Sequence, residues 1–228
     1  MDDLREFERL NTRKASFVHV GGFRPTGDPF ASHFGLQPRA APGETWPTAG
    51  GRPLLFVCQL NLTVAPAAPA LLADIQLLTF FVDPEASPLA RENGEDWRVF
   101  AYPSLTGLVA MTRPGSAPAL QRGFECRWEA CDDHPNHDDP SRVVPDGFDD
   151  SEVELENVAR TKIGGYASTI QSELWWDSEE HPSAPAYCLQ INSEEKAGLN
   201  WGDGGTLYLA RGTAEGCREQ WFLDWQSY

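Results

Sequence analysis

The sequence predicts an α+β protein that is predominantly antiparallel β, with few short helices and two pseudo-repeat halves sharing one core. Short apolar runs recur along the 228 residues, and helical periodicity is scarce. Most runs have a partner nearby in the chain, which favours antiparallel pairing over a doubly wound parallel sheet. A motif also occurs twice, because Gly35 precedes Gln59 by 24 residues and Gly164 precedes Gln190 by 26. A doubled motif indicates one supersecondary unit used twice.

The first half opens with helical periodicity and then turns to strands. Apolar residues recur every three positions over residues 3–12, which predicts a short amphipathic helix. Residues 24–51 are rich in Gly and Pro but include aromatic residues, so we expect an ordered loop. Apolar runs predict strands at residues 14–20, 54–62, 77–82, 97–102, 105–112 and 124–128, and a short helix at 67–74.

An acidic segment separates the two predicted halves. We expect a single domain over residues 1–228, with halves at approximately 15–115 and 155–228 joined by an acidic loop at 130–156. Residues 132–156 contain ten acidic side chains and one arginine, which predicts a solvated loop running into a helix near 151–159. The later strands are predicted at residues 186–192, 205–210 and 220–225. Asp203-Gly204 favours a tight turn, so residues 199–210 are predicted to form a hairpin.

The net charge of −16 restricts the classes of partner. Binding to nucleic acid or to anionic membranes requires basic surface, so we expect neither. A basic protein partner remains compatible with this charge, although solubility alone would also explain it. No run approaches the ~20 apolar residues of a membrane span. The charged start of the chain lacks a signal-peptide pattern, so we expect a cytoplasmic protein.

Motifs for catalysis or cofactors are lacking. The chain has no nucleophile elbow, P-loop or dinucleotide fingerprint, so we favour a non-enzyme, name no catalytic residue and expect no cofactor. The segment Cys131–Asp139 contains His134, His137 and four aspartates, which are possible metal ligands. Their spacing around a proline suits a single site poorly. A hydrated surface loop is the better interpretation, and the two histidines are only weak metal candidates.

Polar residues inside apolar strands are the main candidates for binding. Gln59 and Asn61 alternate along one strand, as Gln190 and Asn192 do along another. A buried amide needs partners, so these side chains either bond loop backbone or line a cleft between the halves. The same two alternatives apply to four further residues. These are Lys162, Gln171, Trp201 and Asp203.

These motifs resemble those of a known family. In the second half they are Thr161–Tyr166, Leu189–Asn192 and Trp201–Gly205, and in the first half Ser32–Gly35, Trp46-Pro47, Gln59–Leu62 and Phe80–Asp83. Together they resemble the YwqG-like (DUF1963) family over roughly residues 15–228. The resemblance implies a bacterial cytoplasmic α+β protein with an internal duplication and no established enzymatic activity. Some members lie near toxin genes, which implies an antitoxin or immunity role.

Two functions from different classes follow from the sequence. The leading hypothesis is a non-catalytic protein-binding module, of immunity or antitoxin type, for a basic partner. The alternative is an enzyme or small-molecule binder that uses a cleft between the two halves. A structure without a concave, partly polar pocket at this cleft would remove the alternative. The cleft is expected near Gln59, Lys162, Gln190, Trp201 and Asp203.

Overall fold

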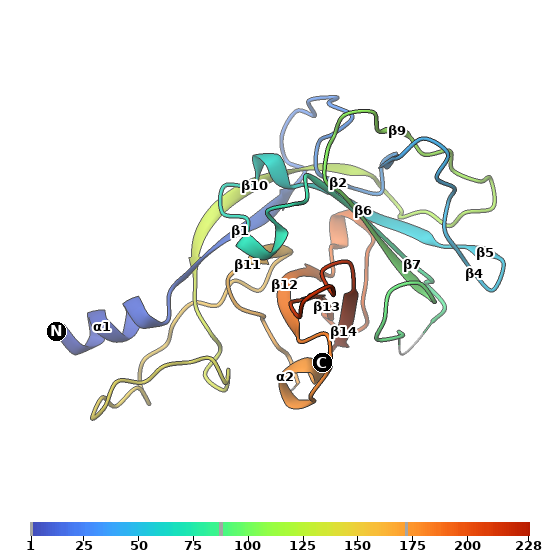
Figure 1. The fold of residues 1–228 in the computed structure, drawn as a ribbon. Helices are drawn as coiled ribbons and strands as arrows, with labels where there is room; N and C mark the ends of the chain where they lie inside the picture. The colour runs from blue at the N-terminus through green and yellow to red at the C-terminus, as the bar shows by residue number, and fades with distance from the viewer. Residues whose placement is uncertain (1, 87–88, 172) are drawn as a thin grey trace.

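The computed structural model describes residues 2–86, 89–171 and 173–228. Most strands in this part of the chain join one antiparallel sheet, which curves until it nearly closes (Figure 1). The strands of this sheet are β1 (Arg13–Val20), β2 (His33–Phe34), β6 (Leu55–Asn61), β7 (Leu77–Val82), β8 (Trp97–Tyr102), β10 (Phe124–Asp133), β11 (Lys162–Gly164), β12 (Pro185–Asn192), β13 (Thr206–Gly212) and β14 (Trp221–Gln226).

The remaining elements are short. Two small ribbons pair β3 (Arg39–Ala40) with β9 (Val109–Ala110) and β4 (Thr48–Ala49) with β5 (Arg52–Pro53). The helices are α1 (Asp2–Leu10), α2 (Trp175–Ser178) and the 3₁₀ turns η1 (Leu62–Val64), η2 (Ala70–Leu72) and η3 (Glu195–Ala197). This mostly antiparallel architecture with few helices confirms the predicted fold class in outline. None of the described helices is long and apolar enough to cross a membrane.

The order of strands in the large sheet has the same form from either end. It runs β14-β13-β12-β11-β1-β10-β2-β6-β7-β8. The long strands β1 and β10 pair at the centre, in a register from Arg13 opposite Asp133 to Val20 opposite Cys126. On each side a short strand comes first, followed by an antiparallel meander of three strands. Matching sets of four strands therefore flank a central pair contributed by segments more than a hundred residues apart.

The gap between the two end strands of the sheet is bridged by residues 91–93. The backbone N–H of Asn93 donates to the Trp221 carbonyl at 3.2 Å, and that of Leu223 donates to the Arg91 carbonyl at 2.9 Å. The Asn93 side chain bonds both the N–H and the carbonyl of Val99, at 3.0 and 3.2 Å. Because Val99 lies in β8 and Trp221 begins β14, this segment connects the two edges of the sheet.

One large apolar cluster fills the inside of the curved sheet. Phe34 and Val57 from one side of the central pair belong to the same cluster as Ile163, Leu189 and Leu207 from the other. Smaller clusters cover the outer surface of each side, around Trp46 with Phe56 and Phe81, and around Trp176 with Tyr208 and Phe222. Both faces of the inner strands are therefore buried, which explains their nearly continuous apolar sequences.

Two predicted elements are wrong. Residues 151–159 form no helix, and Val158 instead donates its backbone N–H to the Asp133 carboxylate at 2.8 Å. Residues 199–210 form no hairpin, because β13 pairs with β12 and β14. The backbone N–H of Leu199 bonds the carbonyl of Glu194 at 3.0 Å within the β12–β13 connection. The Asp133 side chain replaced the helical bonds predicted at 151–159, and the pairing of β13 with β12 replaced the predicted hairpin.

Other boundaries shift without changing the architecture. The strand predicted at 105–112 is reduced to β9, and β10 continues to Asp133, beyond residue 128. The helix predicted at 67–74 is reduced to the single 3₁₀ turn η2. The acidic segment is also less solvated than its composition predicts. Asn11 at the end of α1 exchanges two side-chain hydrogen bonds with the Val143 backbone, both of 2.8 Å.

Candidate functional site

The two glutamines of the doubled motif are fully buried and bond the backbone of adjacent loops. Gln59 Oε1 accepts from the N–H of Arg39 at 2.8 Å, and its Nε2 donates to the carbonyls of Pro29 and Ala31 at 3.1 and 3.0 Å. The Gln59 amide therefore fixes the loop that leads into and out of β2. These contacts are the ones expected of a structural amide.

Gln190 makes the corresponding contacts on the other side of the sheet. Its Oε1 accepts from the N–H of Ser168 at 2.9 Å, and its Nε2 donates to the Arg160 carbonyl at 2.9 Å. Nε2 also donates to Asn192 Oδ1 at 2.9 Å. Gln190 thereby holds the chain on both sides of β11, as Gln59 holds the chain on both sides of β2.

The asparagine positions repeat one contact and differ in another. The backbone N–H of Asn61 donates to Ser32 Oγ at 2.9 Å, and that of Asn192 donates to Thr161 Oγ1 at 3.0 Å. The Asn61 side chain also accepts from the N–H of Thr63 at 3.0 Å, which caps η1. Both asparagines therefore belong to the framework around the glutamines.

Lys162 lies opposite Gln190 and is fully buried in an ion pair. Its Nζ is 2.7 Å from Asp133 Oδ2, and neither side chain is exposed. The same carboxylate oxygen accepts from the N–H of Tyr166 at 2.8 Å. Burial lowers the pKa of Lys162, whereas the neighbouring Asp133 charge acts in the opposite direction. The lysine charge is thus balanced internally.

His33 occupies the matching place opposite Gln59 in the first half. Its ring is buried against Phe56, at 5.5 Å between ring centroids. Burial lowers the pKa of His33 to about 4. The side chain is therefore neutral near pH 7. The difference between the two halves at this position, histidine against lysine, lies inside the protein and not on its surface.

The remaining predicted residues do not converge, and two of them, Gln171 and Asp203, lie at the surface. Asp203 is exposed, and its backbone carbonyl accepts from the N–H of Tyr228 at 3.0 Å. Gln171 is exposed and donates from Nε2 to the Ser227 carbonyl. Trp201 is 9% exposed and lines a cavity, while Gln171 lines a different hollow. The residues predicted to bind therefore form no single site.

The two weak metal candidates, His134 and His137, have different surroundings. His134 has Nε2 3.2 Å from Thr12 Oγ1 and Nδ1 2.9 Å from the Glu156 carbonyl. His137 is exposed and lines the hollow that Gln171 also borders. Within the described ranges no three His, Cys, Asp or Glu side chains gather in a metal-binding arrangement.

Sequence reasoning missed a surface hollow lined by carboxylates, which we call the acidic hollow. It measures about 460 Å³ and lies between the acidic segment and the residues that precede α2. Asp138 and Asp139 come from one side, and Glu173 and Asp177 from the other. The acidic runs are visible in the sequence, but only the fold brings residues 138–139 and 173–177 together.

The pKa of one carboxyl in the acidic hollow, Asp177, is raised. Partial burial, then the charges of Asp139, Glu173 and Asp224, raise the pKa of Asp177 from 3.8 to about 6. Every resolved influence on this carboxyl disfavours its charged form. Asp139, Glu173 and Asp224 therefore make the local potential at Asp177 negative.

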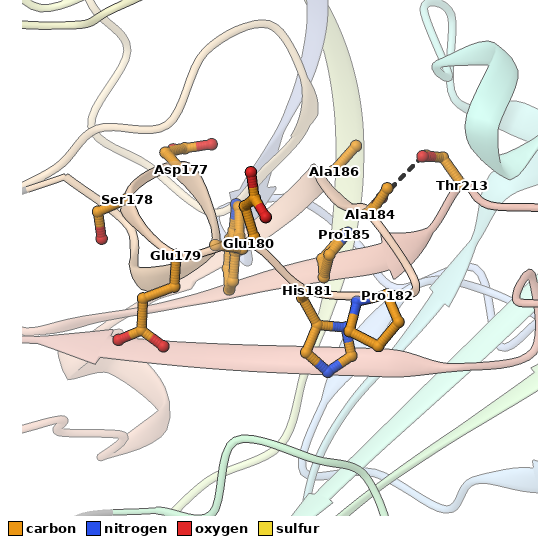
Figure 2. Close-up of a pocket in the computed structure, with 11 residues that line it drawn as sticks. Asp177, Ser178, Glu179, Glu180, His181, Pro182, Ala184, Pro185, Ala186 and Thr213 are labelled. Carbon is orange, nitrogen blue, oxygen red and sulfur yellow. Dashed lines mark hydrogen bonds between the residues drawn. The ribbon is translucent and has the colours of Figure 1, made fainter.

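A second hollow, of about 830 Å³, lies beside α2 and is lined by residues 176–182 and 184–186 and by Thr213. Figure 2 shows that the carboxylates of Asp177, Glu179 and Glu180 point in different directions. Glu179 is paired with Arg91 at 2.6 Å, and Thr213 Oγ1 donates to the Ala184 carbonyl at 2.7 Å. This hollow places further carboxylates next to the acidic hollow, with which it shares Asp177. Its carboxylates do not converge on one point as a catalytic acid and base would.

Asp177→Asn is expected to stabilise the protein at about pH 8 and to have little effect at about pH 4. A carboxyl whose pKa is raised by folding binds its proton more tightly in the native state, so stability is lost as pH rises from about 4 through about 6. Much of the side chain meets solvent, so we expect a gain of only ~0.5 kcal/mol. Thermal unfolding at both pH values measures it, and an equal change at both would contradict the assignment.

Comparison with known proteins agrees with the motifs. The family model described as "Domain of unknown function (DUF1963)" matches residues 32–210, which is most of the chain. This range includes β2, β6, β11 and β12, and with them Gln59, Lys162 and Gln190. No curated protein matches the sequence. The resemblance seen in the motifs is thus confirmed, and the chain belongs to the DUF1963 family.

Proposed function

We propose that this protein is a non-catalytic binding module that engages a basic protein partner through the acidic hollow. The observation that carries the proposal is the gathering of Asp138, Asp139 and Asp177 at one concave surface, where burial and then neighbouring like charges raise the pKa of Asp177. A lysine or arginine placed there would relieve the repulsion and gain charge-assisted hydrogen bonds. A basic toxin domain is the partner class we propose, with an immunity- or antitoxin-type role.

The use of the buried charges supports a binding role over catalysis. Lys162 is paired with Asp133 at 2.7 Å, and the nearly unexposed Arg211 is paired with Asp74 at 2.6 Å. Both buried cations are thus already paired with carboxylates. The acidic hollow, in contrast, presents charge to solvent, which steers association with an oppositely charged partner and disfavours nucleic acid.

We also propose that the two halves arose by internal duplication. The contacts of Gln59 with Arg39 and Ala31 match those of Gln190 with Ser168 and Arg160 in both donor and acceptor roles. The matching order of strands on the two sides of β1 and β10 also supports this origin. A single domain in the cytoplasm of a bacterium is the setting that this proposal assumes.

The test combines isolation of a partner with removal of charge from the acidic hollow. Tagged protein expressed in its native cells is isolated at low salt, and a recovered stoichiometric partner should be basic. Its affinity is then measured by calorimetry against wild type and against a variant with three neutralised carboxylates. The variant carries Asp138→Asn, Asp139→Asn and Asp177→Asn, all at the acidic hollow. We expect it to bind about tenfold more weakly at low salt, because three favourable charge interactions are lost.

A second variant controls for net charge alone. It neutralises three exposed carboxylates outside the two hollows, through Asp3→Asn, Glu95→Gln and Glu215→Gln. This control should bind like wild type, and both variants should keep the wild-type melting temperature within a few degrees. Equal weakening by the two variants, or a partner whose affinity does not change with salt, would overturn the proposal.

A further inference from the structure

A short loop before β8 closes the gap between the two end strands of the sheet, and we call residues 90–96 the clasp. The loop is tied together at its ends, because the N–H of Ala90 donates to the Asp96 carboxylate at 2.9 Å. Its middle pairs with β14 through an antiparallel bridge between Glu92 and Phe222. The clasp therefore joins the edge of β14 to the start of β8.

Asn93 holds the clasp through its side-chain amide. Oδ1 accepts from the N–H of Val99 at 3.0 Å, and Nδ2 donates to the carbonyl of the same residue at 3.2 Å. The backbone N–H of Asn93 donates across the gap to the Trp221 carbonyl at 3.2 Å. Satisfying both backbone groups of Val99 requires one acceptor and one donor on the same side chain, which an amide has and a carboxylate lacks.

The next position of the clasp requires glycine. Gly94 has a φ of 123°, which side chains with a Cβ rarely adopt. Its N–H donates to the Trp97 carbonyl at 3.0 Å. The Arg98 guanidinium lies beside it, since a Cβ added at Gly94 would be 3.4 Å from Arg98 Nη1. The fold therefore calls for an amide at position 93 followed directly by a glycine.

This dipeptide is chemically labile. When glycine follows asparagine, no side chain hinders the glycine nitrogen from reaching the amide carbon of the asparagine. The sequence contains the Asn-Gly pair only at residues 93–94. In the closed clasp both reacting groups are engaged, because the Asn93 amide bonds Val99 and the Gly94 N–H bonds Trp97. The reaction therefore requires the clasp to open first.

We propose that Asn93 is a site of spontaneous deamidation and that its conversion releases the clasp in one direction. The Gly94 nitrogen loses its proton and attacks Asn93 Cγ. The Cγ–Nδ2 bond then breaks, and Nδ2 takes up a proton and leaves as ammonia, which gives a cyclic succinimide. Water opens this ring to aspartate at one carbonyl or to isoaspartate at the other. The positive charge of Arg98 beside Gly94 favours loss of the proton from the attacking nitrogen.

The converted clasp cannot regain its hydrogen bonds. A carboxylate at position 93 has no donor for the Val99 carbonyl, and its charge joins those of Glu92, Glu95 and Asp96 in the same loop. Isoaspartate also inserts a methylene group into the backbone and displaces the clasp from β14. This inference does not rest on the proposed protein-binding function, since no residue of the clasp lines the acidic hollow.

The rate of conversion tests whether the clasp opens by itself. The full chain is incubated near neutral pH, folded or unfolded in urea, and peptide mapping by mass spectrometry follows conversion at Asn93. We expect the folded chain to react at least about tenfold more slowly than the unfolded chain, but faster than global unfolding would allow. Equal rates would overturn the proposal, and so would a rate in the folded chain that matches the global unfolding equilibrium.

The variant Asn93→Asp tests the consequence, because it imitates the product. Hydrogen exchange is measured at the amide of Leu223, which donates to the Arg91 carbonyl at 2.9 Å across the gap. We expect exchange there to be at least about tenfold faster than in wild type. Asn200→Asp adds the same charge at an exposed asparagine outside the clasp and should change this rate less than about twofold.

The amide of Val18, in the central pair of strands, reports whether the rest of the sheet stays folded. It donates to the Thr161 carbonyl at 3.0 Å and should exchange equally in wild type and in both variants. Unchanged exchange at Leu223 in Asn93→Asp would contradict release of the clasp. Equal acceleration by Asn93→Asp and Asn200→Asp would show an effect of charge alone and would also overturn the proposal.

Discussion

Replacing Lys162 with methionine is expected to lower the free energy of unfolding by about 3–5 kcal/mol. The side chain of Asp133 is fully buried, and Lys162 Nζ is its cationic partner at 2.7 Å. Removing the ammonium leaves a carboxylate in a low-dielectric interior, where an unpaired charge is far more costly than a lost surface ion pair. Urea unfolding of Lys162→Met, monitored by tryptophan fluorescence, measures the loss.

The double variant Lys162→Met/Asp133→Asn separates the charge from the packing. An asparagine at position 133 keeps an oxygen that can accept from the N–H of Val158 or Tyr166, which Asp133 bonds at 2.8 Å each. The double variant should therefore be more stable than Lys162→Met alone. If the single variant lost less than about 1 kcal/mol, the ion pair would behave as a surface pair does, and the structural role would be wrong.

Gln190→Met and Gln59→Met should each cost about 2–4 kcal/mol, since each leaves buried backbone groups without partners. In the first variant these groups are the N–H of Ser168 and the carbonyl of Arg160. Chemical denaturation compares both with Gln37→Met, a control at an exposed glutamine whose single hydrogen bond is 3.5 Å long. The control should change stability by less than ~0.5 kcal/mol.

Equal, small losses in all three glutamine variants would show that the buried amides contribute little to the framework. A large loss in only one of Gln59→Met and Gln190→Met would contradict the matched roles we assign to them. Because the two amides lie on opposite sides of the central strands, their effects should add in the double variant.

The strands that are buried on both faces were predictable, because such burial leaves a continuous apolar run in the sequence. Residues 77–82 show this best, since the predicted strand and β7 coincide. The pairing of β1 with β10 was not predictable, because it joins residues 13–20 to 126–133 and no local pattern encodes that contact. The false helix at 151–159 has a similar cause, since the Asp133 carboxylate binds the backbone there.

The candidate site was predictable only in part, because contacts between distant segments leave no local pattern in the sequence. Buried glutamines in apolar strands must find partners, so the framework role of Gln59 and Gln190 was one of two alternatives available from sequence. The acidic hollow depends on a meeting of Asp138 with Asp177 across the fold, which composition alone does not indicate. Trp201 was singled out for its place near a glycine-rich turn, but its unpaired N–H required the structure.

The central claim is that the doubled motif holds the framework and that binding takes place elsewhere. Hydrogen exchange of the backbone amides of Arg39 and Ser168 tests it most directly, because these amides donate to Gln59 and Gln190. We predict that both exchange only when the protein unfolds globally, with opening free energies within about 1 kcal/mol of the global value. Exchange near the rate of an unfolded chain would show that these loops open freely and would contradict the account.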